Sequence, residues 1–222
     1  MRDNVKRIVI IAGLVVVAAI GVYFGYHWHQ QSKLIEAITP HVKNTSIRTS
    51  NALSYEITEG SKITYKELFE KLEADISEID KRLLEVQTIS TPATKIKTDI
   101  VFAYLNGCQE MLRAQLWKYR KQLALSSASK WFDKSLGLYK VVGYYGFEYA
   151  RKTVEEALKA LNEAGREYEE AKSNLVVTAK KLTEIRTQIA SIVSADNLVD
   201  PNALAKVVDV NNKKKDETTT AK

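Results

Sequence analysis

A heptad pattern in the C-terminal half of the chain restricts its fold more than any other feature. Between Val154 and Ile192, apolar residues recur in alternating steps of three and four. The positions are Val154, Ala157, Leu161, Ala164, Tyr168, Ala171, Leu175, Thr178, Leu182, Ile185, Ile189 and Ile192, and eleven of these twelve are apolar. A period of 3.5 residues predicts a coiled-coil seam for a partner helix. We therefore expect a long helix over about 149–193.

The partner helix is expected just upstream, over about 92–136. Thr91 and Pro92 are typical of a helix cap and a first helical residue. The broad apolar face of this segment comprises Ile96, Ile100, Tyr104, Cys108, Met111, Leu112 and Leu116. The sole cysteine, Cys108, falls within this face, so we interpret it as a small core residue.

A shorter hairpin is expected before these two helices. Thr64 and Glu67 have the spacing of a capping box, which predicts a helix over about 64–89. Its apolar stripe is Leu68, Leu72, Ile76, Ile79, Leu83 and Val86. The preceding helix is expected over about 30–58, with a kink or restart at Pro40 and a turn at Glu59–Ser61. A short helix over 201–208 and a disordered polar tail over 210–222 complete the chain.

The segment Ile8–Tyr26 carries no charged residue. As a helix it would be about 28 Å long, which matches the hydrocarbon thickness of a bilayer, so we predict a single transmembrane anchor. Arg2, Lys6 and Arg7 precede it, which places residues 1–7 in the cytoplasm and the bulk outside, in the manner of a bacterial inner (plasma) membrane protein with a periplasmic domain. A cleaved signal peptide is the main alternative, but the run is longer than such peptides use.

The fold class predicted from these elements is all-α. A transmembrane helix is followed by an elongated antiparallel bundle over 27–209 with a long coiled-coil hairpin. Only three prolines interrupt the 222 residues, which favours helix throughout. Because the second hairpin is longer than the first, its distal end should project beyond the bundle.

That distal end is rich in aromatic residues. Between Trp131 and Tyr149, the candidate partner-binding residues are Trp131, Phe132, Tyr139, Tyr144, Tyr145 and Phe147. Tyrosine and tryptophan are enriched in interface hot spots because they bury much area for little rotamer entropy. The alternative interpretation is that these side chains pack on one another and cap the hairpin.

No motif in the sequence indicates chemistry. We find no nucleophile–base pair, no phosphate-binding glycine loop and no zinc spacing, so we expect neither an enzyme nor a metal or cofactor site. The net charge is +6, but both signs are interleaved along the chain, which is typical of a solvated helical surface and argues against nucleic-acid binding.

Two hypotheses for function follow. The first is a membrane-anchored structural or protein-interaction module that binds another protein, or a second copy of itself, through the bundle or its aromatic tip. The second is a tethered ligand-binding sensory or solute-binding domain. The predicted outline resembles that of bacterial chemoreceptor ectodomains, which are four-helix bundles outside an N-terminal membrane helix.

Overall fold

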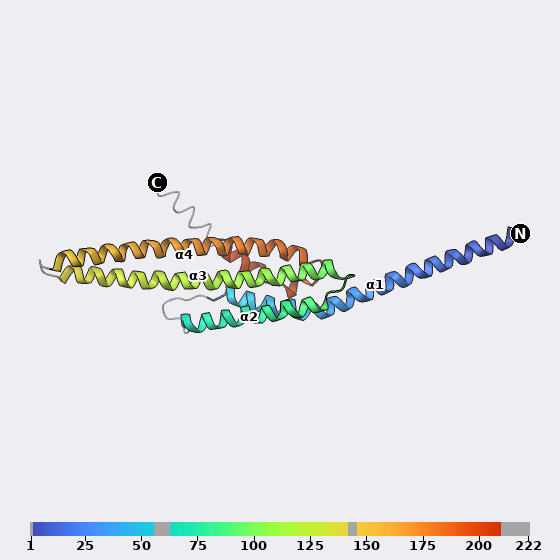
Figure 1. The fold of residues 1–222 in the computed structure, drawn as a ribbon, viewed down its shortest axis with the longest axis horizontal. Coiled ribbons are helices and arrows are strands. Elements are labelled where there is room, and N and C mark those ends of the chain that lie inside the picture. Colours follow the sequence, from blue (N-terminus) through green and yellow to red (C-terminus); the bar gives the residue numbers. More distant parts are fainter. Residues whose placement is uncertain (1, 56–62, 142–145, 210–222) are drawn as a thin grey trace.

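The computed structural model describes residues 2–55, 63–141 and 146–209, with the backbone alone described for residues 2–12. This part of the chain is helical and contains no strand. The long helices are α1 (Arg2–Leu53), α2 (Tyr65–Ile89), α3 (Lys95–Val141) and α4 (Phe147–Ile189). A short 3-10 helix, η2 (Ala195–Asn197), and a helical segment over residues 201–209 follow. The expected all-α, antiparallel bundle is confirmed (Figure 1).

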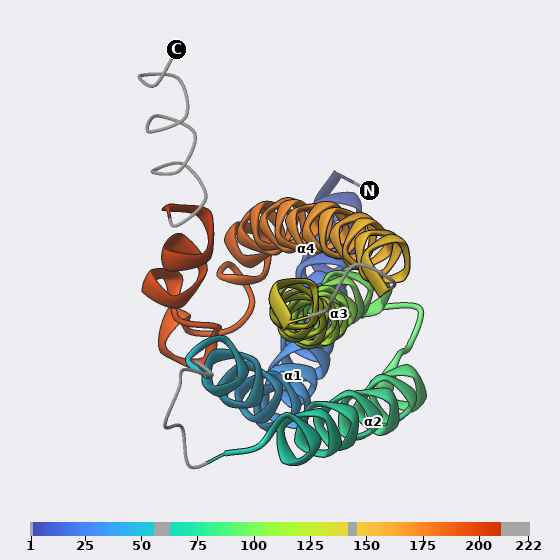
Figure 2. The same cartoon turned by 90° about the vertical axis from the view of Figure 1, so that its left-hand side faces the viewer.

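The helices are arranged around α3. Figure 2 shows α1, α2, α4 and the C-terminal segment placed around it, and α3 packs against each of the other three long helices. The α3–α4 pair is the most extensive of these contacts. As expected from their lengths, α3 and α4 run on past the ends of α1 and α2 and form a hairpin that projects alone (Figure 1).

Helix α1 continues through Pro40 without a break, so the expected restart there is wrong. Proline removes one intrahelical hydrogen bond, which would join it to the carbonyl of Glu36. Both residues are exposed, so water can solvate that carbonyl. On the opposite face Ile38 and Val42 are fully buried and hold the helix against its neighbours on both sides of the proline. The expected turn at 59–61 lies outside the described residues, as does the tail over 210–222.

Within the described part of the chain, no helix combines the length and the apolar character needed to cross a membrane. Residues 8–12 of the expected anchor lie outside the residues whose side chains are described. The rest of that segment, residues 13–26, is helical and exposed along its whole length.

Helix α2 begins as the sequence predicted. The Thr64 N–H donates to Glu67 Oε2 at 2.8 Å, and the Glu67 N–H donates to Thr64 Oγ1 at 3.3 Å. This capping box lowers the pKa of the Glu67 carboxyl, chiefly through the hydrogen bond from the Thr64 backbone. Five of the six predicted stripe residues are buried and Ile76 is half-buried.

The second hairpin differs from the expectation at its ends. Residues 92–94 form a turn, and α3 begins at Lys95 because the Thr91 carbonyl accepts from the Thr94 N–H at 3.0 Å. At its other end α3 passes Gly137 and reaches Val141, five residues later than predicted. Every one of the twelve heptad positions is buried or half-buried, although Ile192 lies beyond the end of α4. The expected seam therefore faces the interior.

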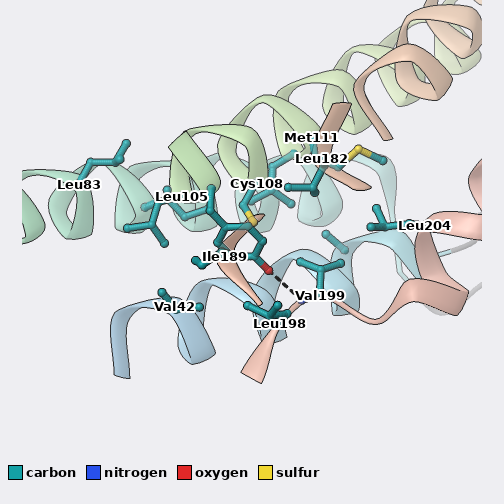
Figure 3. Close-up of a cluster of buried hydrophobic side chains, with 14 of the residues drawn as sticks. Val42, Leu83, Leu105, Cys108, Met111, Leu182, Ile189, Leu198, Val199 and Leu204 are labelled. Carbon is teal, nitrogen blue, oxygen red and sulfur yellow. Dashed lines mark hydrogen bonds between the residues drawn. The ribbon is translucent and has the colours of Figure 1, made fainter. Parts of the chain in front are cut away.

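The C-terminal segment is part of the core. Leu198, Val199 and Leu204 are buried and lie against α1, α3 and α4 (Figure 3). The Val199 N–H donates to the hydroxyl of Tyr104 at 2.8 Å, and the same hydroxyl is 2.8 Å from Ser46 Oγ. Burial raises the pKa of Tyr104 above its ordinary value, so this hydroxyl stays protonated and available for both contacts.

Candidate functional site

The free end of the α3–α4 hairpin exposes a group of large apolar side chains, which we call the tip surface. Its members are Trp131, Leu138, Tyr139, Val141, Phe147 and Tyr149. Tyr149 is 77% exposed, Phe147 48% and Trp131 42%, so none of the three is covered by the rest of the described chain. Burial of such side chains is favourable, and exposed apolar patches are a feature of interaction sites, so the tip surface is the candidate site.

The fully buried positions between the two projecting helices are occupied by small residues. Along the projecting hairpin, the buried residues are Ser135, Ala150, Ala157 and Ala164. Small side chains let the two helices approach closely, and the large ones are left at the flanks of the contact. The Ser135 hydroxyl donates to the Trp131 carbonyl at 2.9 Å, so even the one polar group in this seam is satisfied within α3.

The structure describes four of the six predicted tip residues, and these four lie in two groups. Tyr139 and Phe147 come together across the hairpin end, with ring centroids 5.2 Å apart at an angle of 46°. Trp131 and Phe132 lie earlier on α3 than Tyr139. Trp131 is exposed and Phe132 is half-buried. Tyr144 and Tyr145 lie outside the described residues. The tip thus contains both a local aromatic contact and free aromatic surface.

Cys108 is fully buried beside Tyr104, as the sequence predicted for a core residue. Burial raises the pKa of its thiol to about 12, so the group is protonated near neutral pH and unsuited to nucleophilic chemistry. Elsewhere among the described residues, no three His, Cys, Asp or Glu side chains gather in a way that could hold a metal ion.

A second feature was not anticipated from the sequence. A cleft of about 260 Å³ opens between the end of α1, the middle of α3 and α4, and the helical segment over 201–209. Its lining, as far as the described residues form it, includes Lys118, Lys172 and Lys206 and no acidic residue. We call it the lysine cleft. Because these lysines stand 54 and 34 positions apart on three different elements, no local pattern could have indicated their proximity.

Comparison with protein-family models, with curated protein sequences and with solved structures found no match to this chain.

Proposed function

We propose that this protein is a membrane-anchored helical stalk that binds another protein, outside the cytoplasm, through the tip surface. The observation that carries the proposal is the set of uncovered aromatic and aliphatic side chains at the free end of the hairpin. Aromatic anchors of this kind supply most of the binding free energy in protein interfaces. The function is structural or adaptor-like, and it is not enzymatic.

The position of the tip supports a partner that is bound far from the N-terminus. The tip surface and the N-terminus lie at opposite ends of the long axis of the molecule (Figure 1). Helix α3 has 47 residues, so it spans about 70 Å at a rise of 1.5 Å per residue. A contact made there is far from whatever holds the N-terminus, whether the partner is a different protein or the tip of a second copy.

The anchor is part of the proposal. Leu14, Val17, Val22 and Phe24 on α1 are each more than 60% exposed, so the described part of the chain leaves a large apolar surface uncovered there. A bilayer matches the length and composition of Ile8–Tyr26. The basic residues before it favour a cytoplasmic N-terminus and an extracytoplasmic bundle, in a membrane of the bacterial inner (plasma) type. A reporter that functions only in the cytoplasm, fused after Lys222, should give no signal, and a strong signal would contradict this orientation.

The binding proposal is tested by photo-crosslinking in intact membranes. A photoreactive amino acid replaces Tyr149, and in a control strain it replaces Lys180, which is exposed on the shaft of α4. We expect a specific adduct from position 149 alone, and its loss when Leu138→Ser and Phe147→Ser are added without a change in melting temperature. An adduct with the mass of two copies would show that the tip binds a second copy of this chain and not another protein. Equal adducts from both positions would refute the tip as the binding site.

The alternative function, a ligand-binding sensory or solute-binding domain, is favoured by one observation, the lysine cleft. A sensory domain needs a partly polar pocket between helices, and the cleft has this character. The two functions are compatible, because the cleft and the tip surface share no residue.

A further inference from the structure

The bundle begins close to the end of the proposed anchor. Leu34 is the first residue of α1 whose described side chain is buried, and it lies eight positions beyond Tyr26. Between these two residues, Gln31 Nε2 donates to the Ala93 carbonyl at 3.1 Å, which holds the turn between α2 and α3 against α1. Figure 1 shows this turn at the end of the bundle from which α1 continues alone toward the N-terminus. In the proposed orientation, the α2–α3 turn is therefore on the side of the bundle that faces the bilayer.

The distance from the anchor to this turn is close to the thickness of the lipid headgroup layer. Gln31 is five positions beyond Tyr26, so it lies about 7.5 Å along α1 from the end of the span. The headgroup layer is about 5–8 Å thick on each side of a bilayer. Neighbouring helix axes are about 8–10 Å apart, so a tilt of α1 by about 20° toward the turn brings the turn about 3 Å closer to the membrane. The start of α3 is then within reach of the headgroups.

The start of α3 exposes a large apolar side chain. Ile96 is 80% exposed, although it belongs to the first turn of a helix that packs on three others. The Cα–Cβ bonds of a helix tilt toward its N-terminus, and the N-terminus of α3 faces the bilayer, so the Ile96 side chain leans toward the membrane. On α1, Trp28 is 75% exposed just beyond the proposed span, at the level where tryptophan is enriched in membrane proteins. The lipid interface is an environment in which both side chains can be buried.

Two lysines near the same level carry a charge without a partner. Lys33 on α1 and Lys97 on α3 form no ion pair with any residue whose side chain is described. Lys95 Nζ lies 2.8 Å from Asp99 Oδ2, so these two charges compensate each other. The next acidic residue on α1, Glu36, is almost one turn further from the bilayer. Because α1 and α3 both run away from the membrane, the Lys33 and Lys97 side chains lean toward it, where anionic headgroups attract lysine.

We propose that the bundle rests on the bilayer that α1 crosses, with the start of α3 as a second membrane contact. Ile96 is buried among the lipid headgroups, and Lys33 and Lys97 bind the phosphate groups of anionic phospholipids. The contact also sets the direction in which α1 tilts, because only a tilt toward the α2–α3 turn brings Ile96 to the lipid. The inference rests on the proposed anchor and is independent of what the tip surface binds.

The test measures fluorescence quenching with the full chain in lipid discs. Single cysteines carry an environment-sensitive fluorophore at the proposed contact (Ile96→Cys), in the anchor (Val22→Cys) and at a matched exposed isoleucine of α1 (Ile47→Cys), which lies about 30 Å along the helix from Tyr26. Cys108 is buried and does not take up the label in the folded chain. The discs contain phosphatidylcholine with a spin label in the headgroup or in the acyl chain, with or without phosphatidylglycerol.

We expect headgroup quenching at position 96 and none at position 47, and acyl-chain quenching at position 22. Phosphatidylglycerol should strengthen the quenching at position 96 by about twofold or more. Lys33→Gln with Lys97→Gln should abolish this increase, whereas Lys180→Gln with Lys181→Gln, on the exposed face of α4, should retain it. Circular dichroism confirms that each variant is folded.

The anchor and the second contact can fail separately. Quenching at position 22 without quenching at position 96 would overturn the second contact and leave the anchor in place. Equal headgroup quenching at positions 96 and 47 would also overturn it, because the bundle would then lie along the membrane. An increase with phosphatidylglycerol that survives the Lys33 and Lys97 substitutions would refute the role of these lysines. No quenching at position 22 would refute the anchor and, with it, this inference.

Discussion

The two halves of the α3–α4 hairpin are built differently. In the half that lies beside α1 and α2, the buried side chains are large, among them Tyr104, Met111, Leu112 and Leu182. In the projecting half, the fully buried side chains are serine and alanine, and the large residues are half-buried, as Phe132 and Leu161 are, or exposed. The same two helices therefore contribute to a hydrophobic core at one end and to an exposed surface at the other.

The difference predicts that folding stability and the proposed binding at the tip depend on different halves of the hairpin. The main core cluster extends along α3 only as far as Tyr119 and along α4 only from Leu175 onward. Burial of large apolar side chains contributes about 1.5–3 kcal/mol each, so most of the folding free energy comes from this region. The projecting half contributes less, and regions with few buried contacts open locally at lower free energy. Changes at the tip should consequently affect binding more than folding.

The largest effect should come from a charge in the core. Leu182→Asp places a carboxylate at a fully buried position, which costs several kcal/mol of unfolding free energy. Leu161→Asp changes a half-buried heptad position in the projecting half, where the carboxylate keeps part of its hydration and the loss should be smaller. Lys180→Asp is the exposed control. If thermal melting showed equal losses for the two leucine variants, the distinction between the halves would be wrong.

The rate of thiol labelling should differ between the core and the tip of the hairpin. Because burial raises the pKa of Cys108 to about 12, the thiolate fraction at pH 8 is about one in ten thousand, and reagent cannot reach the group without unfolding. In Tyr149→Cys, the new thiol is exposed and should react faster by a factor of about 100 or more. Urea should abolish the difference. Fast labelling of Cys108 in the folded protein would show that the core opens readily.

Removal of the Tyr104 hydroxyl should loosen the C-terminal segment. In Tyr104→Phe the Val199 N–H loses its buried acceptor, at a cost of about 1–3 kcal/mol. Amide hydrogen exchange at Val199 should accelerate more than exchange at Leu72 of α2. Tyr149→Phe, at an exposed position, should change neither. Protection of Val199 that survives the substitution would mean that apolar packing alone holds the segment.

The smallest predicted change in stability comes from replacing a glycine by alanine, once in each half of the hairpin. Gly137 has open space around the position of an added Cβ, so Gly137→Ala should stabilise the projecting half by about 0.5–1 kcal/mol through helix propensity. At Gly107 an added Cβ would lie 3.2 Å from Leu182 Cδ1 and 3.4 Å from Ile185 Cδ1, so crowding should offset that gain. Urea denaturation measures the free energy of unfolding of both variants. An equal increase at both sites would show that the core side chains move to accommodate the added methyl group.

Features that depend on local spacing could be predicted from the sequence. The capping box of α2, the heptad seam of α4 and the burial of Cys108 all follow from residues a few positions apart. Features that depend on contacts between distant segments could not. The bond from Val199 to Tyr104 joins residues 95 positions apart, and the lysine cleft requires three elements to meet. Even the continuity of α1 at Pro40 depends on packing of the opposite face, which overrides the local preference of proline.

Because α1 is one continuous helix, a change in the tilt of its N-terminal half also moves the bundle at its other end. No hinge is available between its N-terminal half and the bundle, because a single helix joins Tyr26 to Leu53 over about 40 Å. In the proposed membrane anchor, a tilt of about 20°, which is average for membrane helices, would move Leu53 sideways by about 14 Å and carry the whole hairpin with it. The angle at which the N-terminal half is held therefore decides which volume of space the tip can search.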